Sequence, residues 1–216
     1  MIDYKMTPQE YFKKIIELYQ KSREPEYYNP NILRGRSSSI SSKLEDLTAL
    51  FIALNNPCNC NYYTDQPIKF EGSTTKYPDI VIQEANGKIK NLIDVKTDIG
   101  WNRDGMFKFC KEWENRIEKI KSTKTQFKLG VDKKLVEGSF SENLHYHVLV
   151  ISKINSGKQI ESDYKKVEQE MKNVSLYILS DSVHPNNYEF TIKKTLQNII
   201  INNNEFERML NRIIEV

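Results

Sequence analysis

The segments Tyr77-Pro78-Asp79-Ile80-Val81-Ile82 and Leu92-Ile93-Asp94-Val95-Lys96, with Asn86-Gly87 between them, decide the fold that the sequence predicts. Both segments are short and contain several β-branched residues, which favour strands. Asn-Gly between two such segments is the strongest short-range signal for a tight hairpin turn. We therefore predict two antiparallel strands, at 78–83 and 88–96, joined by that turn.

Asp94 and Lys96 are predicted to share one face of the second strand, because alternate side chains of a strand point the same way. Antiparallel pairing would place Asp79 beside Asp94, and two adjacent carboxylates repel each other and raise a pKa. A divalent cation removes that conflict, since Mg²⁺ and Mn²⁺ prefer hard oxygen ligands. The hairpin therefore predicts a cation site at Asp79 and Asp94, with Lys96 beside it. The alternative is an ordinary salt bridge between Asp94 and Lys96 on a solvated face.

The rest of the chain predicts helices around a sheet. Thr7 and Glu10 form a capping-box pattern that opens a first helix. We expect a loop at 25–39, a helix at 40–55, a strand at 66–70, a helix at 103–121, a strand at 146–152, a helix at 159–172, a strand at 175–180 and a helix from about 194. The helix between the last two strands indicates a crossover between parallel neighbours. The predicted fold class is α/β, with a mixed β-sheet flanked by helices.

Composition indicates one globular domain, 1–216, of 38% hydrophobic and 28% charged residues. No apolar run approaches the roughly 20 residues that cross a bilayer, and no hydrophobic segment follows the N-terminal charges. Three cysteines form no disulfide framework, and Cys58-Asn59-Cys60 lacks the second ligand pair of a zinc site. We therefore expect a cytoplasmic protein without a membrane partner.

Pro78-Asp79, followed by Asp94-Val95-Lys96, closely resembles the PD-(D/E)xK motif of the restriction-endonuclease-like nucleases. The two aspartates are 94 − 79 = 15 residues apart, which suits two strands and a tight turn. The resemblance covers a core of about 39–152, and both ends of the chain lie outside it. It implies a restriction-endonuclease-like sheet preceded by a helix that carries an acid, and Glu45 matches that place.

The resemblance also implies roles for these residues. Asp79, Asp94 and the backbone carbonyl of Val95 would hold Mg²⁺, for which Mn²⁺ could substitute, and Lys96 would orient a water and stabilise developing negative charge. Glu45 would act through a metal-bound water or as a ligand of a second ion. The alternative for Glu45 is a capping box with Ser42, and Asp46 is the second choice for the acid on this helix.

Two basic segments are candidate DNA contacts on a chain with a net charge of only +3. Arg34-Gly35-Arg36-Ser37 directly precedes the Glu45 helix, and its guanidinium and hydroxyl groups suit phosphate. Residues 101–134 contain ten basic and five acidic side chains, with Arg103 closest to the predicted catalytic strand. We assign Arg34, Arg36, Ser37 and Arg103 to DNA binding. The alternative is a flexible polar loop and a solvated helix face.

Together these features predict a Mg²⁺-dependent endonuclease acting on double-stranded DNA, most specifically a type II restriction endonuclease. One chain holds one catalytic constellation, so cleavage of both strands predicts a homodimer. The alternatives are a non-catalytic DNA-binding or interaction protein that keeps the nuclease fold, and a repair or recombination nuclease. His145 and His147 are expected to face solvent at the start of a strand, without a catalytic role.

Overall fold

The computed structural model describes residues 4–25, 27, 29–70, 75–100, 105–129 and 133–215. Its helices are α1 (Pro8–Lys21), α2 (Ser41–Asn55), α3 (Met106–Ile120), α4 (Ile160–Glu170), α5 (Ile192–Asn198) and α6 (Asn203–Glu215). Its strands are β1 (Cys60–Thr64), β2 (Ile68–Lys69), β3 (Thr75–Lys76), β4 (Ile80–Glu84), β5 (Lys88–Lys96), β6 (Lys124–Leu129), β7 (Lys134–Val150), β8 (Val174–Ile178), β9 (Ser180–Asp181) and β10 (Ile200–Ile201). The chain therefore has a mixed α/β fold.

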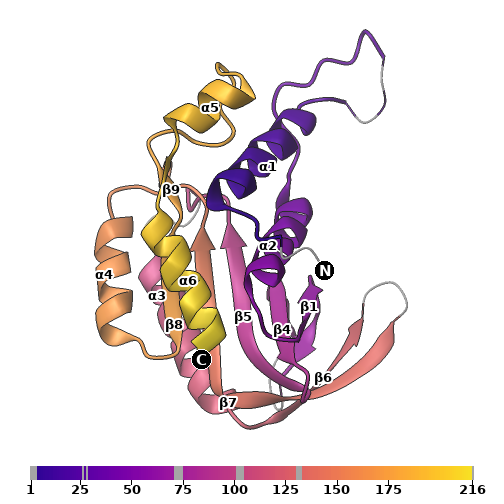
Figure 1. Cartoon of the computed structure of the whole chain (residues 1–216), viewed down its shortest axis with the longest axis vertical. Helices are drawn as coiled ribbons and strands as arrows, with labels where there is room; N and C mark the ends of the chain where they lie inside the picture. Colours follow the sequence, from indigo (N-terminus) through magenta and orange to yellow (C-terminus); the bar gives the residue numbers. More distant parts are fainter. Residues whose placement is uncertain are drawn as a thin grey trace.

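A mixed, mostly antiparallel sheet of eight strands forms the centre of the molecule (Figure 1). The strand order is β1-β4-β5-β7-β6-β2-β3, and β8 also pairs with β7. The two parallel pairings, β5 with β7 and β7 with β8, lie side by side. Each needs a crossover, and α3 and α4 lie in the two connections, as expected for parallel neighbours.

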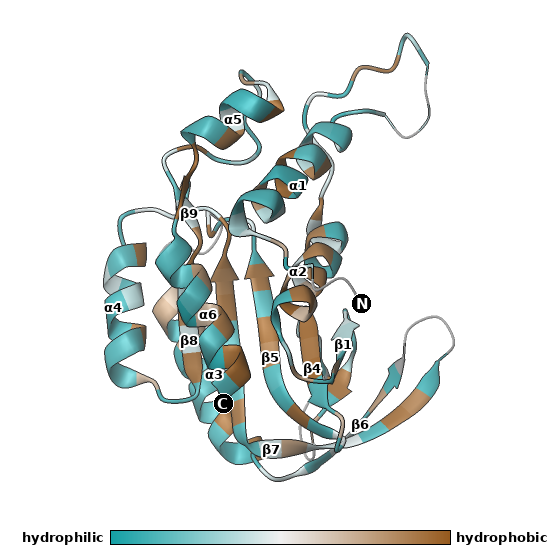
Figure 2. Ribbon diagram, viewed as in Figure 1, coloured by the Kyte–Doolittle hydropathy of each residue, from teal (hydrophilic) through white to brown (hydrophobic). Residues whose placement is uncertain are grey.

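Helices cover both faces of this sheet (Figure 2). The strands β4, β5 and β7 therefore carry buried apolar side chains on both sides. On one face, α1, α2 and α6 pack on a cluster that includes Ile82 and Ile93. On the other face, α3 and α4 pack on a cluster that includes Val81 and Leu92. The alternation along the strands thus sends neighbouring residues into two separate cores.

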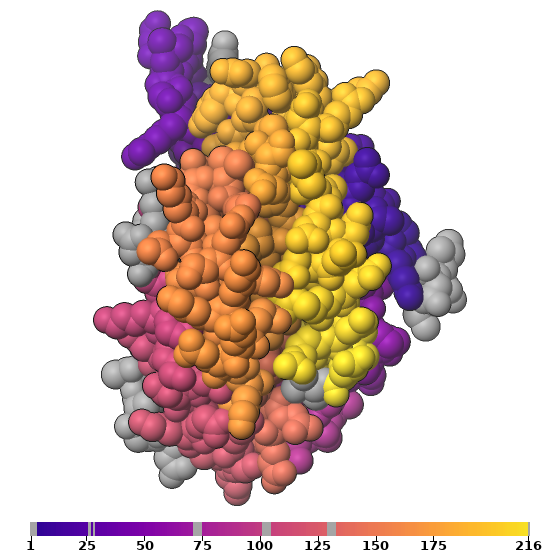
Figure 3. Space-filling model, turned by 90° about the vertical axis from the view of Figure 1, so that its left-hand side faces the viewer, coloured from indigo at the N-terminus to yellow at the C-terminus, as the bar shows by residue number. Residues whose placement is uncertain are grey.

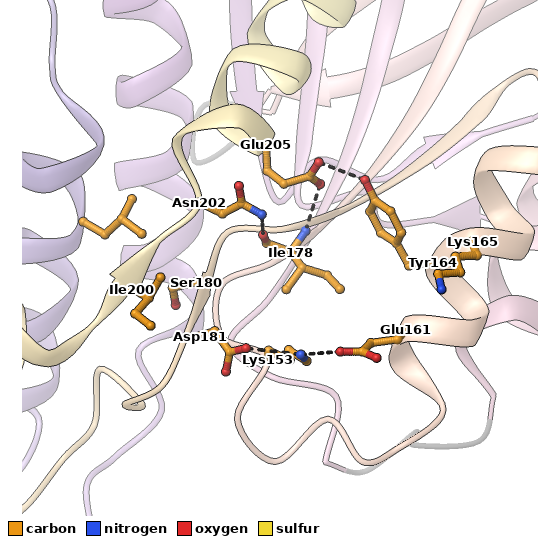
Figure 4. A pocket seen from close by; sticks show the side chains of 11 residues that line it. Lys153, Glu161, Tyr164, Lys165, Ile178, Ser180, Asp181, Ile200, Asn202 and Glu205 are labelled. Atoms are coloured by element: carbon orange, nitrogen blue, oxygen red, sulfur yellow. Dashed lines mark hydrogen bonds and ion pairs between the residues drawn. The ribbon is translucent and has the colours of Figure 1, made fainter.

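The outer edge of β8 is closed by polar side chains of α6 rather than by another strand (Figure 4). Glu205 accepts the backbone N–H of Ile178 at 3.3 Å, and Arg208 donates to the carbonyl of Leu176 at 2.6 Å. The Arg208 guanidinium also binds Glu205 and lies 4.2 Å from the centre of the Tyr177 ring. Satisfying an edge in this way prevents pairing with another chain.

Several sequence predictions are confirmed. The Thr7–Glu10 capping box opens α1, α2 ends at Asn55, and β4 and β5 form the antiparallel hairpin. The predicted crossover helix is α4, between the parallel strands β7 and β8.

Other predictions were wrong. The strand expected at 146–152 is β7, which begins twelve residues earlier at Lys134 and pairs there with the unpredicted β6. The first half of β7 has a polar sequence that contains a glycine, and such a composition is more typical of a loop than of a strand. Gly138 is needed there, because a β-carbon would lie 2.9 Å from the Gly87 carbonyl oxygen of the hairpin turn. The strand β1 was also missed, and the single C-terminal helix is two helices, α5 and α6, separated by β10.

None of the helices in the described ranges is long and apolar enough to span a membrane.

Candidate active site

Three of the predicted catalytic residues, Asp79, Asp94 and Lys96, lie where the β4–β5 hairpin opens, at the C-terminal end of β5. The last paired residues are Ile80 and Ile93, so Asp79 and Asp94 follow directly beyond the ladder. Asp79 accepts the backbone N–H of Val95 at 2.6 Å, and its own carbonyl accepts the N–H of Asp65. The Asp79 carboxylate is therefore fixed between the ends of two strands.

Lys96 and Asp94 lie on the same face of β5, as their spacing predicts. The Lys96 ammonium donates to Asp94 at 2.9 Å and lies 6.0 Å from the centre of the Phe109 ring on α3. Asp94 is only 7% exposed, which excludes an ordinary ion pair on a solvated face. The ion pair expected in the alternative interpretation is present, but Asp94 is buried and does not lie on a solvated face.

Burial, followed by the charge of Asp94 and a hydrogen bond shared with it, raises the pKa of Asp79 to about 8. The Val95 N–H and the Lys96 charge oppose this rise only in part. At neutral pH the Asp79 carboxyl therefore keeps its proton. Two adjacent carboxyl groups are a typical cation-binding arrangement, since a cation can replace such a proton.

The backbone carbonyl of Val95 belongs to the same site. The N–H and C=O of one strand residue point to the same side, and the Val95 N–H points to Asp79. The neighbouring Lys96 carbonyl instead accepts the N–H of Ile151, next to β7. Asp79, Asp94 and the Val95 carbonyl can therefore present three hard oxygen atoms to one volume.

Glu45 faces this acidic end of the sheet without touching it. Burial raises the pKa of Glu45, with further contributions from the charges of Asp65 and Asp46, while Lys96 lowers it in part. The capping-box alternative for Glu45 is wrong, because α2 is capped at Ile40 without a side-chain hydrogen bond. Within the described ranges, no group of three or more His, Cys, Asp or Glu side chains is placed to hold a metal ion.

Asp46, the second choice for the acid on α2, has a structural contact instead. It accepts a hydrogen bond from the Thr64 hydroxyl at 2.8 Å, which joins α2 to the end of β1. Of the two acids on α2, Asp46 therefore makes a structural contact and Glu45 faces the candidate site.

Tyr146 is a component of the site that the sequence did not identify. It is buried on β7 and hydrogen-bonds Asp94, and burial followed by the charges of Asp94 and Asp79 raises its pKa well above the usual value. The Trp113 ring stacks on it with a centroid distance of 3.9 Å. Only the register of β5 against β7, which places Leu92 beside Tyr146, could have identified this residue.

His145 and His147 are buried, contrary to the expectation that they face solvent. His147 bonds Asn91 at 2.8 Å and the Tyr177 hydroxyl at 3.2 Å, and His145 bonds Ser175 at 2.9 Å. Burial lowers the pKa of His145 to about 3. They lie within β7, between β5 and β8, so their polar partners come from both neighbouring strands.

The residues assigned to DNA binding have different surroundings. Arg34 and Arg36 are exposed. Ser37 donates its N–H to the Tyr188 hydroxyl at 3.0 Å, and its hydroxyl accepts from the side-chain amide of Asn186 at 2.9 Å. Ser37 is thus already engaged within the protein. Arg103 lies outside the described residues.

Comparison with known proteins adds no assignment. No protein-family model matches the chain, and no curated protein or solved structure matches it.

The hollow at the β8 edge, of about 460 Å³, is separate from the residues described above (Figure 4). Its polar wall consists of Lys153 bonded to Glu161 and Asp181, and of Glu205 bonded to Tyr164. One lysine faces three acids along this wall, so the wall carries more acidic than basic side chains.

Proposed function

We propose that this chain is a Mg²⁺-dependent endonuclease that hydrolyses phosphodiester bonds of double-stranded DNA, with a restriction-endonuclease-like fold. The observation that carries the proposal is the pair Asp79 and Asp94 at the open end of the hairpin, with Lys96 on the same face. The mixed sheet flanked by helices, with an acid-bearing helix ahead of the hairpin, supports the same assignment.

The donor set fits a hard divalent cation. The two adjacent carboxyl groups of Asp79 and Asp94, together with a backbone carbonyl, supply oxygen ligands. Mg²⁺ meets these preferences and retains several waters when bound by so few protein ligands, and Mn²⁺ can substitute. When bound, the ion supplies a Lewis acid for the scissile phosphate and lowers the pKa of a coordinated water.

The remaining groups orient and stabilise. The Val95 N–H holds Asp79, and Tyr146 holds Asp94, so neither carboxylate needs to reorganise when substrate arrives. The Lys96 ammonium faces the same volume and would stabilise negative charge on the phosphate. Glu45, set back on α2, would accept a proton or hydrogen bond from a water between it and Lys96.

Cleavage of both DNA strands at one position requires two such sites related by symmetry. We therefore propose a homodimer, and a type II restriction endonuclease as the specific role. A repair or recombination nuclease would use the same chemistry. These roles differ in oligomeric state and cleavage pattern.

One observation favours a second candidate, a DNA-binding protein that has the nuclease fold without catalysis. The Lys96 ammonium lies 2.9 Å from an Asp94 carboxylate oxygen, which a bound metal ion would need as its ligand. In the nuclease, this contact has to loosen when the cation binds. In the non-catalytic protein it would remain.

The test is incubation of supercoiled plasmid with the protein in Mg²⁺ or in EDTA, followed by sequencing of the ends. We expect Mg²⁺-dependent cleavage that Asp94→Ala abolishes and that Lys96→Ala slows by about 10³-fold or more. Lys88→Ala is the matched control, because Lys88 is exposed at the other end of β5. Full cleavage by Asp94→Ala would refute the assignment. Binding without cleavage by the natural protein would favour the second candidate.

A further inference from the structure

The loop between α1 and α2 forms an arm, described at residues 23–25, 27 and 29–37, that projects from the upper end of the molecule (Figures 1 and 3). Its two ends meet where the Ser38 N–H donates to the Ser22 carbonyl at 2.9 Å. Fifteen residues closed in this way can reach at most about 25 Å from their base. At its tip, Asn29, Pro30, Asn31 and Ile32 form a turn closed by the Ile32 N–H on the Asn29 carbonyl.

The base of the arm is held firmly. The Arg23 guanidinium donates to Asn186 at 3.0 Å and to the Asn187 carbonyl at 2.8 Å, and it lies 4.3 Å from the centre of the Tyr188 ring. The same segment binds Ser37 on the other side of the base. The arm is therefore anchored on both sides, which reduces the entropy that a ligand must remove.

The residues that anchor the arm, Asn186, Asn187 and Tyr188, closely follow His184, and His184 connects this segment to the candidate active site. His184 Nε2 lies 3.3 Å from the Asp98 carboxylate, and Asp98 follows Lys96 by two residues. On its other side the arm leads into α2, which carries Glu45. The arm therefore rises from the same end of the molecule as the catalytic residues.

Beyond the turn, the arm exposes apolar and basic side chains together. Leu33 is 90% exposed and Ile32 is 51% exposed, and Arg34 and Arg36 beside them are exposed as well. The sequence contains no acid between Glu26 and Glu45. A single exposed leucine is ordinary on a protein surface. An apolar pair next to two arginines, on a narrow arm with a fixed base, matches the side chains that enter the DNA minor groove.

We infer that the arm enters the minor groove of double-stranded DNA, with Leu33 as an apolar wedge against the base pairs and Arg34 and Arg36 along the groove. The inference rests on the proposed function. The narrow groove concentrates negative potential, which attracts guanidinium groups, and an apolar side chain there partly unstacks a base step. A second copy of this chain is a poorer occupant, because symmetric apolar contact at Leu33 would bring like-charged arginines together.

The experiment separates the apolar contact from the ionic contacts. The host is Asp94→Ala, and the probe is a 40-base-pair duplex of mixed sequence with a donor and an acceptor dye at its ends. Leu33→Ala is compared with Leu135→Ala, since Leu135 is also exposed (51%) but lies on β7, where it pairs with Lys128 of β6. Anisotropy gives affinity at several salt concentrations, and energy transfer reports bending.

We expect Leu33→Ala to weaken binding about fivefold to tenfold and to reduce a bend of roughly 20–90°. The slope of log affinity against log salt should stay unchanged, because an apolar contact releases no counterions. Arg34→Ala should instead lower that slope by about one phosphate contact. Leu135→Ala should match the host, and netropsin, a minor-groove ligand, should compete with the host.

Affinity and bending within twofold of the host in Leu33→Ala would overturn the inference, as would equal losses in Leu135→Ala. A change from dimer to monomer in Leu33→Ala, measured by light scattering, would make a second copy the occupant. If the natural protein cleaves DNA but Leu33→Ala changes neither affinity nor bending, the role of the arm is refuted and the proposed nuclease function stands. If the natural protein neither binds nor cleaves DNA, both the role of the arm and the nuclease function are refuted.

Discussion

Replacing Asp79 by asparagine should stabilise the metal-free protein at pH 8. Burial and the neighbouring Asp94 raise the pKa of Asp79 to about 8, so the folded protein keeps a proton that the unfolded chain releases near pH 4. The stability contributed by this carboxyl is therefore complete below about pH 4 and is lost as the pH rises towards 8. Asparagine has no proton to lose, and its side-chain oxygen can still accept the Val95 N–H.

The size of the effect follows from the shift. The difference between about 8 and the ordinary value of 3.8 is about 4 pKa units, which sets a ceiling of about 6 kcal/mol at about 1.4 kcal/mol per unit. Relaxation around the partly exposed carboxyl and entry of water reduce the measurable part, so we expect about 1–3 kcal/mol at pH 8. At pH 5 the natural protein should have lost about 1.5 kcal/mol or less.

Urea unfolding in EDTA at pH 5 and at pH 8 measures this difference, with equal slopes against urea as the check that both proteins unfold alike. Glu142→Gln, an exposed acid on β7, is the matched control and should change stability little at either pH. Mg²⁺ should stabilise the natural protein by about 2.7 kcal/mol at a hundred times its Kd, and Asp79→Asn much less. An Asp79→Asn protein that is less stable than the natural one at pH 8 would refute the reasoning.

Three further outcomes are expected. Glu45→Gln should slow Mg²⁺-dependent plasmid cleavage about 10²-fold without changing Mg²⁺ affinity, whereas Asp46→Asn should cleave normally; equal rates for both variants would remove Glu45 from the mechanism. Arg208→Ala should lower the free energy of unfolding by about 2–4 kcal/mol in urea titrations, because Glu205 and the β8 backbone lose their partner. Arg212→Ala, one turn further along α6 and exposed, should cost far less. Light scattering should give a dimer of 2 × 25.4 kDa, about 51 kDa, and discrete plasmid bands; a monomer that produces a smear would exclude the restriction role but not the catalytic one.

The hairpin could be predicted because its signals are local. Asn86-Gly87 defines the turn, and the alternation in 92–96 places Asp94 and Lys96 on one face without any knowledge of the rest of the chain. The antiparallel pairing of β4 with β5 follows from these signals, whereas the register shift between Ile82 and Gln83 does not. The helices with strong apolar periodicity, α1 and α3, were predictable for the same reason.

Features that depend on contacts distant in sequence could not be predicted. The first half of β7 is a strand because it pairs with β6 and its end reaches β5, and its own polar composition favours a loop. His147 is buried because Asn91 and Tyr177 reach it from two other strands, and nothing near it in sequence announces those partners. Tyr146 meets Asp94 through the same parallel register. Sequence periodicity describes faces, but partners across a sheet depend on register.

The treatment of buried charge distinguishes the candidate site from the rest of the molecule. Glu114 accepts backbone N–H groups of Lys172 and Asn173, Glu205 is bound by Arg208, and Asp163 accepts the N–H of Phe107. Each of these acids accepts hydrogen bonds from donors elsewhere in the protein.

Asp79 is different, because burial and the neighbouring Asp94 raise its pKa, and the Val95 N–H and Lys96 offset only part of that rise. The other buried acids are bonded directly to donors. An asparagine in place of Asp79 or Asp94 would have removed the conflict between the two carboxyl groups. Two carboxylates at this position lower stability at neutral pH, so they are best explained by what they bind. Stability and function thus compete at the end of β5, and a divalent cation is the ligand that would relieve the competition.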